Sequence, residues 1–336
     1  MRIGPMKKLI CCLAVLSVVP GLSIAQTPIG LAITETHRLS TAGRLVLPLK
    51  CDGNGNIYGR FPSGADLQVL EFAPDGFQKS SYSYLSDPEL KTAFLQDFAV
   101  TENGELYELL KLRKNRSFVV TFSGDGRLAS RAELLTRYAV TLSHIVALRG
   151  DRFFVSGSHI GDETGKDVGK PFNAIFDGSG RLVREISLKR DVRPKEASGA
   201  DPNGNTNPAV KWGRAVGGDD GNVYVMRQDS PAQVYVVSQA GAVLRTLKVT
   251  APVPRSLPIE LEVSGGRVAI EFSIPDVPGV DDTIIRVVNA QTGQKIADYS
   301  ITPEIGEAVA CFRDDGGFTF LRKTDDWPRI IQTLGR

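Results

Sequence analysis

The sequence predicts an all-β fold built from a repeated unit of four short strands. Two observations support this prediction. A turn of Asp, Asn and Gly residues runs into an apolar, aromatic strand at several places, as in Asp52–Tyr58. A second glycine turn follows all but the last of these, as in Phe72–Gly76. Glycine suits both turns because tight hairpins need a positive φ, which glycine adopts without steric cost.

The first turn recurs six times, at intervals of 44 to 71 residues. Its glycines are Gly55, Gly104, Gly150, Gly221, Gly265 and Gly316. A period of roughly 40–50 residues with four strands per unit is typical of propeller blades, so the count predicts a six-bladed β-propeller. The last unit has only three strands, and we expect the strand-like segment 29–39 to supply its outer strand and close the ring. A seven-bladed ring and an open sandwich are the alternatives, and the six turns disfavour both.

Residues 1–25 are expected to be an export signal, which leaves 26–336 as a single domain. Three basic residues precede Leu9–Val19, an apolar run too short to span a bilayer, and Ser23 and Ala25 stand at the −3 and −1 positions of a cleavage site. The alternative is an N-terminal membrane anchor. We therefore expect a periplasmic or extracellular protein, with no transmembrane segment in the mature chain.

The charge balance argues against nucleic acid as a partner. The 40 basic and 38 acidic residues become 37 and 38 once a leader with three basic residues is removed. A nearly neutral chain with interspersed charges has no electrostatic footprint for nucleic acid. The sequence also has no phosphate-binding loop, no nucleophile elbow and no Cys/His cluster with metal-ligand spacing, so no cofactor and no metal are predicted.

Three stretches carry a resemblance to a known family. Gly55–Tyr58, Val69–Gly76 and Asp220–Val225 resemble the NHL repeats of six-bladed propellers. The resemblance extends over about residues 29–336 and implies that fold. It leaves function open, because the fold class includes binding modules, lyases and lactonases.

Two long insertions are expected on the face opposite the glycine turns, at the mouth of the central channel. They are Gly157–Lys170 and Lys189–Lys211. Long loops on a rigid scaffold often carry function, and the alternative is that they are merely disordered. We expect this face to bind a protein, peptide or carbohydrate.

Aromatic and charged residues in or beside these insertions, or across the ring on the same face, are the candidate binding residues. They are Lys211, Trp212, Arg214, His159, Asp162 and Trp327. The alternative is that each tryptophan packs under its own loop, because tryptophan is usually well buried. His159 and Asp162 would then be solvated parts of the first insertion.

Polar residues at the starts of the inner strands are expected to face the channel. They are Asp97, His144, Arg214, Glu260 and Glu307. The resemblance implies a second possibility here, since gluconolactonases hold a cation with acidic and amide side chains from several inner strands. A lyase or lactonase-like hydrolase would require Asp97, Glu260 and Glu307 to converge. No residue is assigned a catalytic role.

Cys51 and Cys311 are the cysteines that remain after the leader. They stand four and five residues before their turn glycines, in the first and last inner strands. These strands become neighbours when the ring closes, so a Cys51–Cys311 disulfide would staple the closure in an oxidising compartment. The alternative is two buried thiols whose strands stand too far apart to be bridged.

The sequence thus favours an exported binding or scaffold module at the cell envelope. The alternatives are the channel-mouth hydrolase or lyase and a structural surface protein without a small-molecule site.

Overall fold

The computed structural model describes residues 28–41, 45–63, 66–160, 171–188, 212–228, 230–274, 283–306, 308–324 and 327–335. The expected export signal, 1–25, lies outside these ranges. The described residues form 24 strands and three 3-10 helices, η1 (Tyr84–Ser86), η2 (Pro88–Leu90) and η3 (Arg113–Asn115). None of the described helices is long and apolar enough to cross a membrane.

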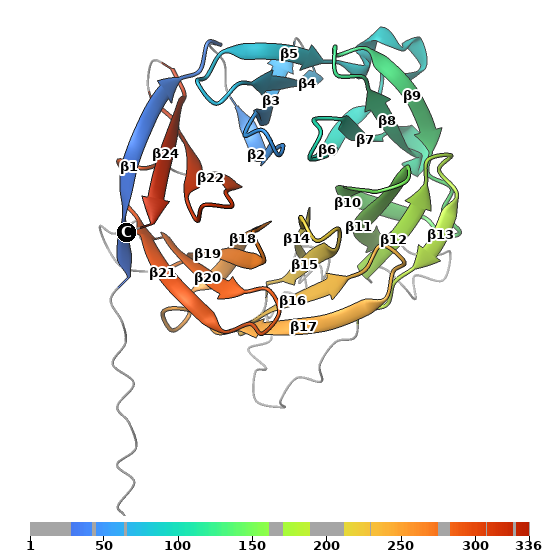
Figure 1. Cartoon of the computed structure of the whole chain (residues 1–336). Coiled ribbons are helices and arrows are strands. Elements are labelled where there is room, and N and C mark those ends of the chain that lie inside the picture. The colour runs from blue at the N-terminus through green and yellow to red at the C-terminus, as the bar shows by residue number, and fades with distance from the viewer. Residues whose placement is uncertain are drawn as a thin grey trace, which may run out of the picture.

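Four antiparallel sheets of four strands take up the first two thirds of the ring (Figure 1). The first is β2 (Val46–Cys51), β3 (Ile57–Ser63), β4 (Asp66–Phe72) and β5 (Gln78–Tyr82). The second is β6 (Phe94–Val100), β7 (Leu106–Lys111), β8 (Ser117–Phe122) and β9 (Leu128–Glu133). The third is β10 (Val140–Leu148), β11 (Arg152–His159), β12 (Pro171–Asp177) and β13 (Leu182–Glu185). The fourth is β14 (Trp212–Gly217), β15 (Val223–Arg227), β16 (Ala232–Val237) and β17 (Val243–Val249).

The rest of the ring is one sheet of eight strands, in the order β18-β19-β20-β21-β1-β24-β23-β22. Its strands from the second half of the chain are β18 (Leu257–Ser264), β19 (Arg267–Ser273), β20 (Thr283–Asn289), β21 (Lys295–Ile301), β22 (Ala308–Phe312), β23 (Phe318–Arg322) and β24 (Arg329–Gly335). The eighth is the N-terminal strand β1 (Ile29–Arg38). The sequence predicts separate four-stranded sheets throughout, whereas the structure joins the last two through β1.

The N-terminal strand pairs with the C-terminal strand, as the sequence predicts. β1 runs antiparallel to β24 from Leu31, opposite Gly335, to Arg38, opposite Arg329. The start of β1 also pairs in parallel with β21, at Ile29↔Tyr299 and Gly30↔Ser300. The two ends of the chain therefore meet in one sheet, and this pairing closes the ring.

The predicted turn glycines all have a positive φ. Three of them, Gly76, Gly126 and Gly180, also stand where the backbone of the outer strand of the preceding sheet passes close by. A Cβ on Gly180 would lie 1.9 Å from the carbonyl oxygen of Glu133, and one on Gly76 would lie 2.3 Å from that of Arg38. Glycine is needed here both for the backbone conformation and for the close approach of the neighbouring sheet.

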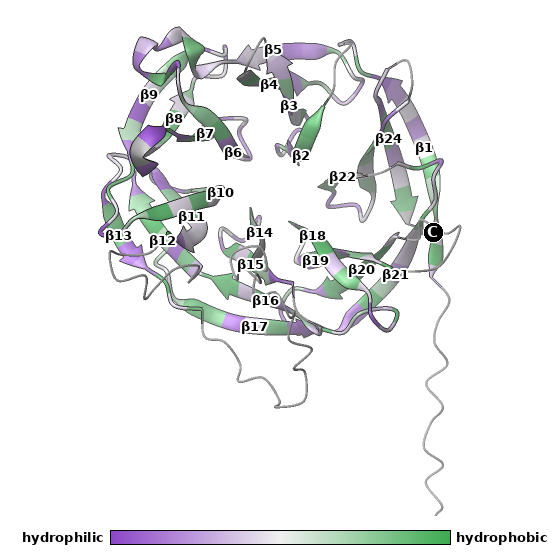
Figure 2. Ribbon diagram, turned by 180° about the vertical axis from the view of Figure 1, so that it is seen from behind, coloured by the Kyte–Doolittle hydropathy of each residue, from purple (hydrophilic) through white to green (hydrophobic). Residues whose placement is uncertain are grey.

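Apolar side chains fill the spaces between neighbouring sheets. Between the first two sheets, Tyr82 packs against Tyr58 and Phe122, with ring centroids 6.3 and 5.6 Å apart. Figure 2 shows the inner strand β2 as mostly hydrophobic and the outer strand β5 as mostly hydrophilic. The core is therefore divided into layers between sheets, which is how a ring of sheets buries both faces of each one.

The first predicted insertion begins later than expected. The sequence places it at Gly157–Lys170, but β11 continues to His159. It pairs with β10 up to His159 and with β12 up to Ser158. The polar Gly-Ser-His stretch is held in the sheet by its backbone pairing, which the composition of the stretch does not reveal. Residues 161–170 and 189–211 lie outside the described part of the chain.

Candidate functional site

The six strands at the inner ends of the sheets surround the centre of the ring (Figure 1). Each of them, β2, β6, β10, β14, β18 and β22, has a register shift in its pairing with the next strand. Several of these shifts come directly before a polar residue, such as Asp97, His144 or Glu260. A bulge kinks a strand and re-aims its side chains. These polar groups consequently meet residues of neighbouring inner strands.

Asp97 links three inner strands. The Lys50 ammonium from β2 lies 3.1 Å from its Oδ1 and also donates to the carbonyl oxygen of Phe98. From β10, the backbone N–H of Ile145 donates to Oδ2 at 3.0 Å, and Nδ1 of His144 lies 3.7 Å from the same oxygen. The Asp97 side chain is only 3% exposed. The structure therefore brings together two of the predicted channel residues, Asp97 and His144, around a lysine that the sequence prediction missed.

The surroundings of Asp97 keep it ionised. Burial by itself raises the pKa of this carboxyl, but the charge of Lys50, the His144 ring and the Ile145 N–H outweigh burial, so the pKa is lowered. For Lys50, burial lowers the pKa and Asp97 opposes the change. Nearby, burial also lowers the pKa of Arg60, whose Nη1 donates to the carbonyl oxygen of Gln96 at 3.0 Å. This cluster joins the first three sheets through buried polar contacts.

A second cluster, the acidic cluster, consists of Glu260, Glu262 and Glu271. The guanidinium of Arg214 on β14 pairs with the Glu260 carboxylate on β18. Glu260 stands directly opposite Glu271 of β19, and Glu262 lies two residues further along β18. Burial raises the pKa of Glu260 to about 7 and Arg214 opposes this. Burial, reinforced by the charge of Glu260, raises the pKa of Glu262 and of Glu271 to about 8.

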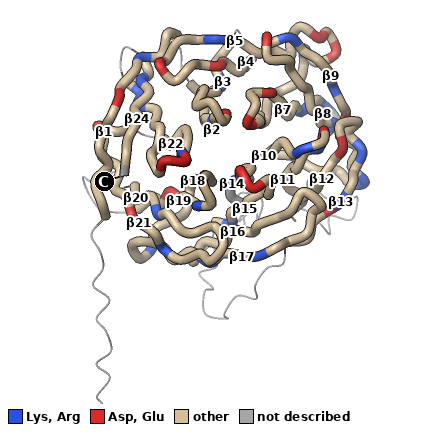
Figure 3. Tube along the Cα trace, viewed as in Figure 1, with Lys and Arg blue, Asp and Glu red and all other residues tan. Residues whose placement is uncertain are grey.

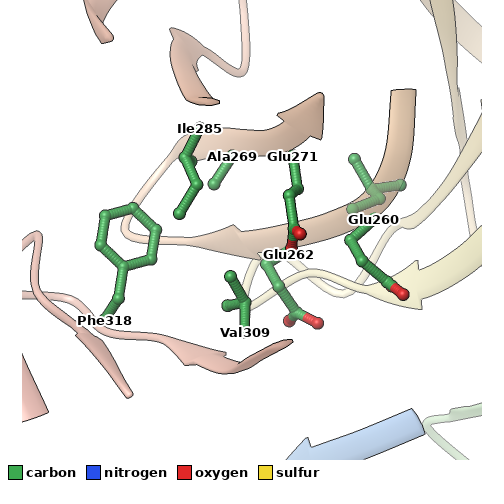
Figure 4. Close-up of a pocket in the computed structure, with 8 residues that line it drawn as sticks. Glu260, Glu262, Ala269, Glu271, Ile285, Val309 and Phe318 are labelled. Carbon is green, nitrogen blue, oxygen red and sulfur yellow. The ribbon is translucent and has the colours of Figure 1, made fainter. Parts of the chain in front are cut away.

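The acidic cluster borders a small cavity (Figure 4). The volume that the centre of a water-sized sphere can reach is about 10 Å³, so the cavity has room for about one water molecule. Its other walls are apolar and come from β18, β19, β20, β22 and β23: Leu261, Ala269, Ile285, Val309 and Phe318. The sequence prediction found Glu260 but missed Glu262 and Glu271. The alternation Glu-Leu-Glu in β18 is a signal that could have revealed Glu262.

Glu108 is a further buried carboxyl, on β7 in the second sheet. It is fully buried, and neither of its carboxyl oxygens has a hydrogen-bond partner. Burial raises its pKa well above the ordinary value, which favours the neutral form of the carboxyl.

Cys51 of β2 and Cys311 of β22 are placed as a disulfide, with their Cα atoms 5.8 Å apart. This separation lies within the usual range for a bridge, about 4.4–6.8 Å. The pair connects the first inner strand to the last, next to the place where β1 and β24 close the ring.

The channel residues do not form a metal site in the part of the chain that the structure describes. No group of three or more His, Cys, Asp and Glu side chains among the described residues is placed to hold a metal ion. Asp97 is paired with Lys50 and Glu260 with Arg214, so each of these two acids has its own cation. Glu307 lies outside the described residues, as do Lys211 and Asp162.

The remaining binding candidates are spread around the ring. Trp212 begins β14, and its side chain is not described, while Arg214 is engaged with Glu260. Trp327 is half-buried, and the Arg38 guanidinium of β1 stacks on its ring, 4.1 Å from the centroid. Trp327 is thus covered by the N-terminal strand.

His159 is an ordered part of β11 and not a solvated loop residue. Its ring packs edge-on against Tyr138 and Phe172, with centroids 5.7 and 5.6 Å apart. The Arg137 guanidinium lies over Tyr138 at 5.5 Å, and the N–H of Ile160 donates to the carbonyl oxygen of Ala139 at 2.9 Å. We call Arg137, Tyr138, His159 and Ile160 the Tyr138 patch.

The Tyr138 patch lies at the strand ends opposite the glycine turns. Tyr138 and Ile160 are 46% and 37% exposed. Phe94 and Leu257, at the starts of β6 and β18, share that face and are also exposed. Among the exposed large apolar residues of the described chain, only Phe77 lies in a glycine turn. The other eight lie on the outer strands β1, β13, β17 and β21, at the end of β24 or after β9: Ile29, Ile33, Leu135, Val183, Val243, Leu244, Ile296 and Leu334.

No family model matches the chain, and no curated protein matches it. Solved structures do. The WD40 domain of Pan2 from Neurospora crassa is similar over 92% of this chain and 95% of that one, with 9% identity and a TM-score of 0.50. The chain has an all-β, propeller-like fold. A protein of unknown function from Bacteroides caccae matches 75% of this chain and 80% of that one, with 10% identity and a TM-score of 0.47. No family match supports the resemblance to NHL repeats in particular.

Acidic and basic residues are interspersed around this propeller-like ring (Figure 3). Two acids of the polar interior, Asp97 and Glu260, are paired with cations, and the exposed apolar groups of the Tyr138 patch lie outside it.

Proposed function

We propose that the protein is a six-bladed β-propeller that acts as a binding or scaffold module at the cell envelope. Six blades follow if the eight-stranded sheet is counted as two, β18–β21 and β22–β24 with β1. Only two residue pairs, Ile29↔Tyr299 and Gly30↔Ser300, join those halves. The six bulged inner strands support the same count.

Export of the chain is part of this proposal. The leader-like sequence of residues 1–25 supports it, and so does the placement of Cys51 and Cys311 as a disulfide, because disulfides persist in oxidising compartments. A periplasmic or extracellular location fits both features.

The Tyr138 patch is the observation that favours binding, and a protein or peptide is the partner it fits. An aromatic ring, an arginine stacked on it and an exposed isoleucine side by side have the composition of interface hot spots. The patch stands where β11 and β12 are joined by residues 161–170, on the face opposite the glycine turns. Phe94 and Leu257 extend the apolar character of that face to other blades.

The alternative is a lyase or lactonase-like hydrolase at the channel mouth. It depends on Asp97, Glu260 and Glu307 converging on one ion. The structure describes two of these acids, and each is already paired with a cation, Asp97 with Lys50 and Glu260 with Arg214. Neither acid therefore supports this alternative.

Partner capture from the native envelope tests the binding proposal. The double variant Tyr138→Ser, Ile160→Ser removes the apolar part of the patch. We expect it to capture less than about a tenth of the partner that the wild type captures, which corresponds to a loss of about 1.4 kcal/mol in binding free energy. The matched control is Val243→Ser, Leu244→Ser on the outer strand β17, whose side chains are 42% and 51% exposed. Equal capture by the two double variants would contradict the assignment of this face.

A further inference from the structure

Several seams between neighbouring inner strands contain a polar or covalent contact. Lys50 and Asp97 pair across β2 and β6, Arg214 and Glu260 pair across β14 and β18, and Cys51 lies against Cys311 across β2 and β22. The seam between β18–β19 and β22–β23 is different. There the acidic cluster faces Val309 and Phe318, which are apolar (Figure 4).

The charges around the acidic cluster do not balance. Arg214 on β14 pairs with Glu260, and Lys50 on β2 is the second cation that acts on the cluster. Lys50, however, is already bound to Asp97. The residues that line the cavity from β20, β22 and β23 are Ile285, Val309 and Phe318, and none of them carries a charge.

Glu271 is buried and only partly compensated. It is 4% exposed, and its Oε2 has no hydrogen-bond partner, while the backbone N–H of Val309 bonds the carboxyl group. Glu260 stands directly opposite it across the strand pair, and like charges in that position repel each other. A buried carboxylate with one unmatched oxygen and a like charge beside it is a strong proton acceptor.

We propose that the seam between β18–β19 and β22–β23 is a proton-operated closure of the ring. Protons on the acidic cluster keep the two halves of the eight-stranded sheet packed against each other. When those protons are lost, repulsion among the carboxylates and their need for water loosen the seam and enlarge the cavity between Glu271, Val309 and Phe318.

The direction of the pH dependence follows from the raised pKa values. Burial raises the pKa of Glu262 and Glu271 to about 8 and that of Glu260 to about 7. A carboxyl whose pKa is higher in the folded state binds more protons there than in the unfolded chain. Its stabilising effect is complete below the unfolded pKa of about 4.3 and is lost as the pH rises through the folded pKa. The loss therefore extends from about pH 4.3 to about pH 8, and the interval from pH 6.0 to pH 8.5 contains its upper part, where the carboxyls of the folded state ionise.

Thermal unfolding of the mature protein at pH 6.0 and pH 8.5 tests the proposal. We expect the wild-type Tm to fall by about 5 °C or more over this interval. A domain of 150–250 residues shifts by about 2–4 °C per kcal/mol, and a larger one shifts somewhat less. Glu271→Gln keeps the shape of the neutral acid and removes one titrating proton. Its Tm should therefore fall by clearly less than the wild-type Tm over the same pH interval. Glu262→Gln is the second variant, in case the first one does not fold. Glu102→Gln, at an exposed position, is the matched control and should behave as wild type.

Hydrogen exchange, corrected for the intrinsic effect of pH, locates the change. Peptides from β19 and β23 should lose protection about tenfold between pH 6.0 and pH 8.5 in the wild type, while peptides from β12, which has no buried carboxyl with a raised pKa, should not. Uniform loss around the ring, or identical pH profiles for the wild type and both glutamine variants, would overturn the proposal. So would full recovery of the Tm at pH 8.5 on addition of Ca²⁺ or K⁺, because the cluster would then be a cation site and not a proton site.

Discussion

Replacing both Cys51 and Cys311 with alanine is expected to lower the free energy of unfolding by about 5 kcal/mol. In the chain-entropy model, a bridge across a loop of this length restricts the unfolded chain by about that amount. The two residues are 260 positions apart and connect the first inner strand to the last. The loss should thus be large compared with the stability of an ordinary domain, about 5–15 kcal/mol.

Denaturant unfolding of the mature protein measures this effect, and mass spectrometry without reductant counts its free thiols. The wild type should have no free thiol at Cys51 or Cys311. Reductant should remove most of the difference in the free energy of unfolding between the wild type and the double variant. Two free thiols per chain, or equal stabilities without reductant, would show that the ring closes without the bridge.

The Asp97→Ala variant is expected to lose about 3–5 kcal/mol of the free energy of unfolding, because the buried charge of the Lys50 ammonium is then uncompensated. Asp97 also accepts the N–H of Ile145, so the change removes contacts to β2 and β10 together. The pKa of Asp97 is lowered in the folded state. Its stabilising effect is accordingly present above the unfolded pKa of about 3.9 and is lost as the pH falls below it.

Equilibrium unfolding of three variants separates the charge from the packing. Asp125→Ala removes a carboxylate from an exposed ion pair with Arg127 and should leave the free energy of unfolding nearly unchanged, because solvent screens such a pair. The double variant Lys50→Met, Asp97→Leu removes both buried charges and should be more stable than Asp97→Ala. A double variant as unstable as the single one would mean that the pair acts through packing and not through charge.

The repeat made most of the fold predictable from the sequence. The glycines of both turns needed a positive φ, and this requirement marked the hairpins before any strand was placed. The segment 29–39 was the only strand-like stretch before the first repeat, and the last repeat lacked a strand, so the β1–β24 pairing followed. The joining of the last two sheets was not predictable, because it depends on two residue pairs between β1 and β21.

The site was predictable only in part, because side-chain direction in the inner strands depends on bulges that no local pattern marks. Asp97 and Glu260 stood out as acids in apolar strands. Lys50 was missed because its stretch, Leu45–Cys51, reads as an ordinary inner strand ending at a cysteine. Glu271 was missed because it lies on a second strand, β19, and reaches the cluster only through its pairing with Glu260. The Tyr138 patch depends on the late end of β11, which places His159 in the sheet.

Photo-crosslinking in the native envelope is the most direct test of the proposal that the face opposite the glycine turns binds a protein partner. A photoreactive residue is placed at position 160 in the Tyr138 patch, at position 77 in a glycine turn, or at position 244 on the outer strand β17. The proposal predicts a specific protein adduct from position 160 that is absent or much weaker from positions 77 and 244. An adduct of equal or greater yield from position 77 would contradict it.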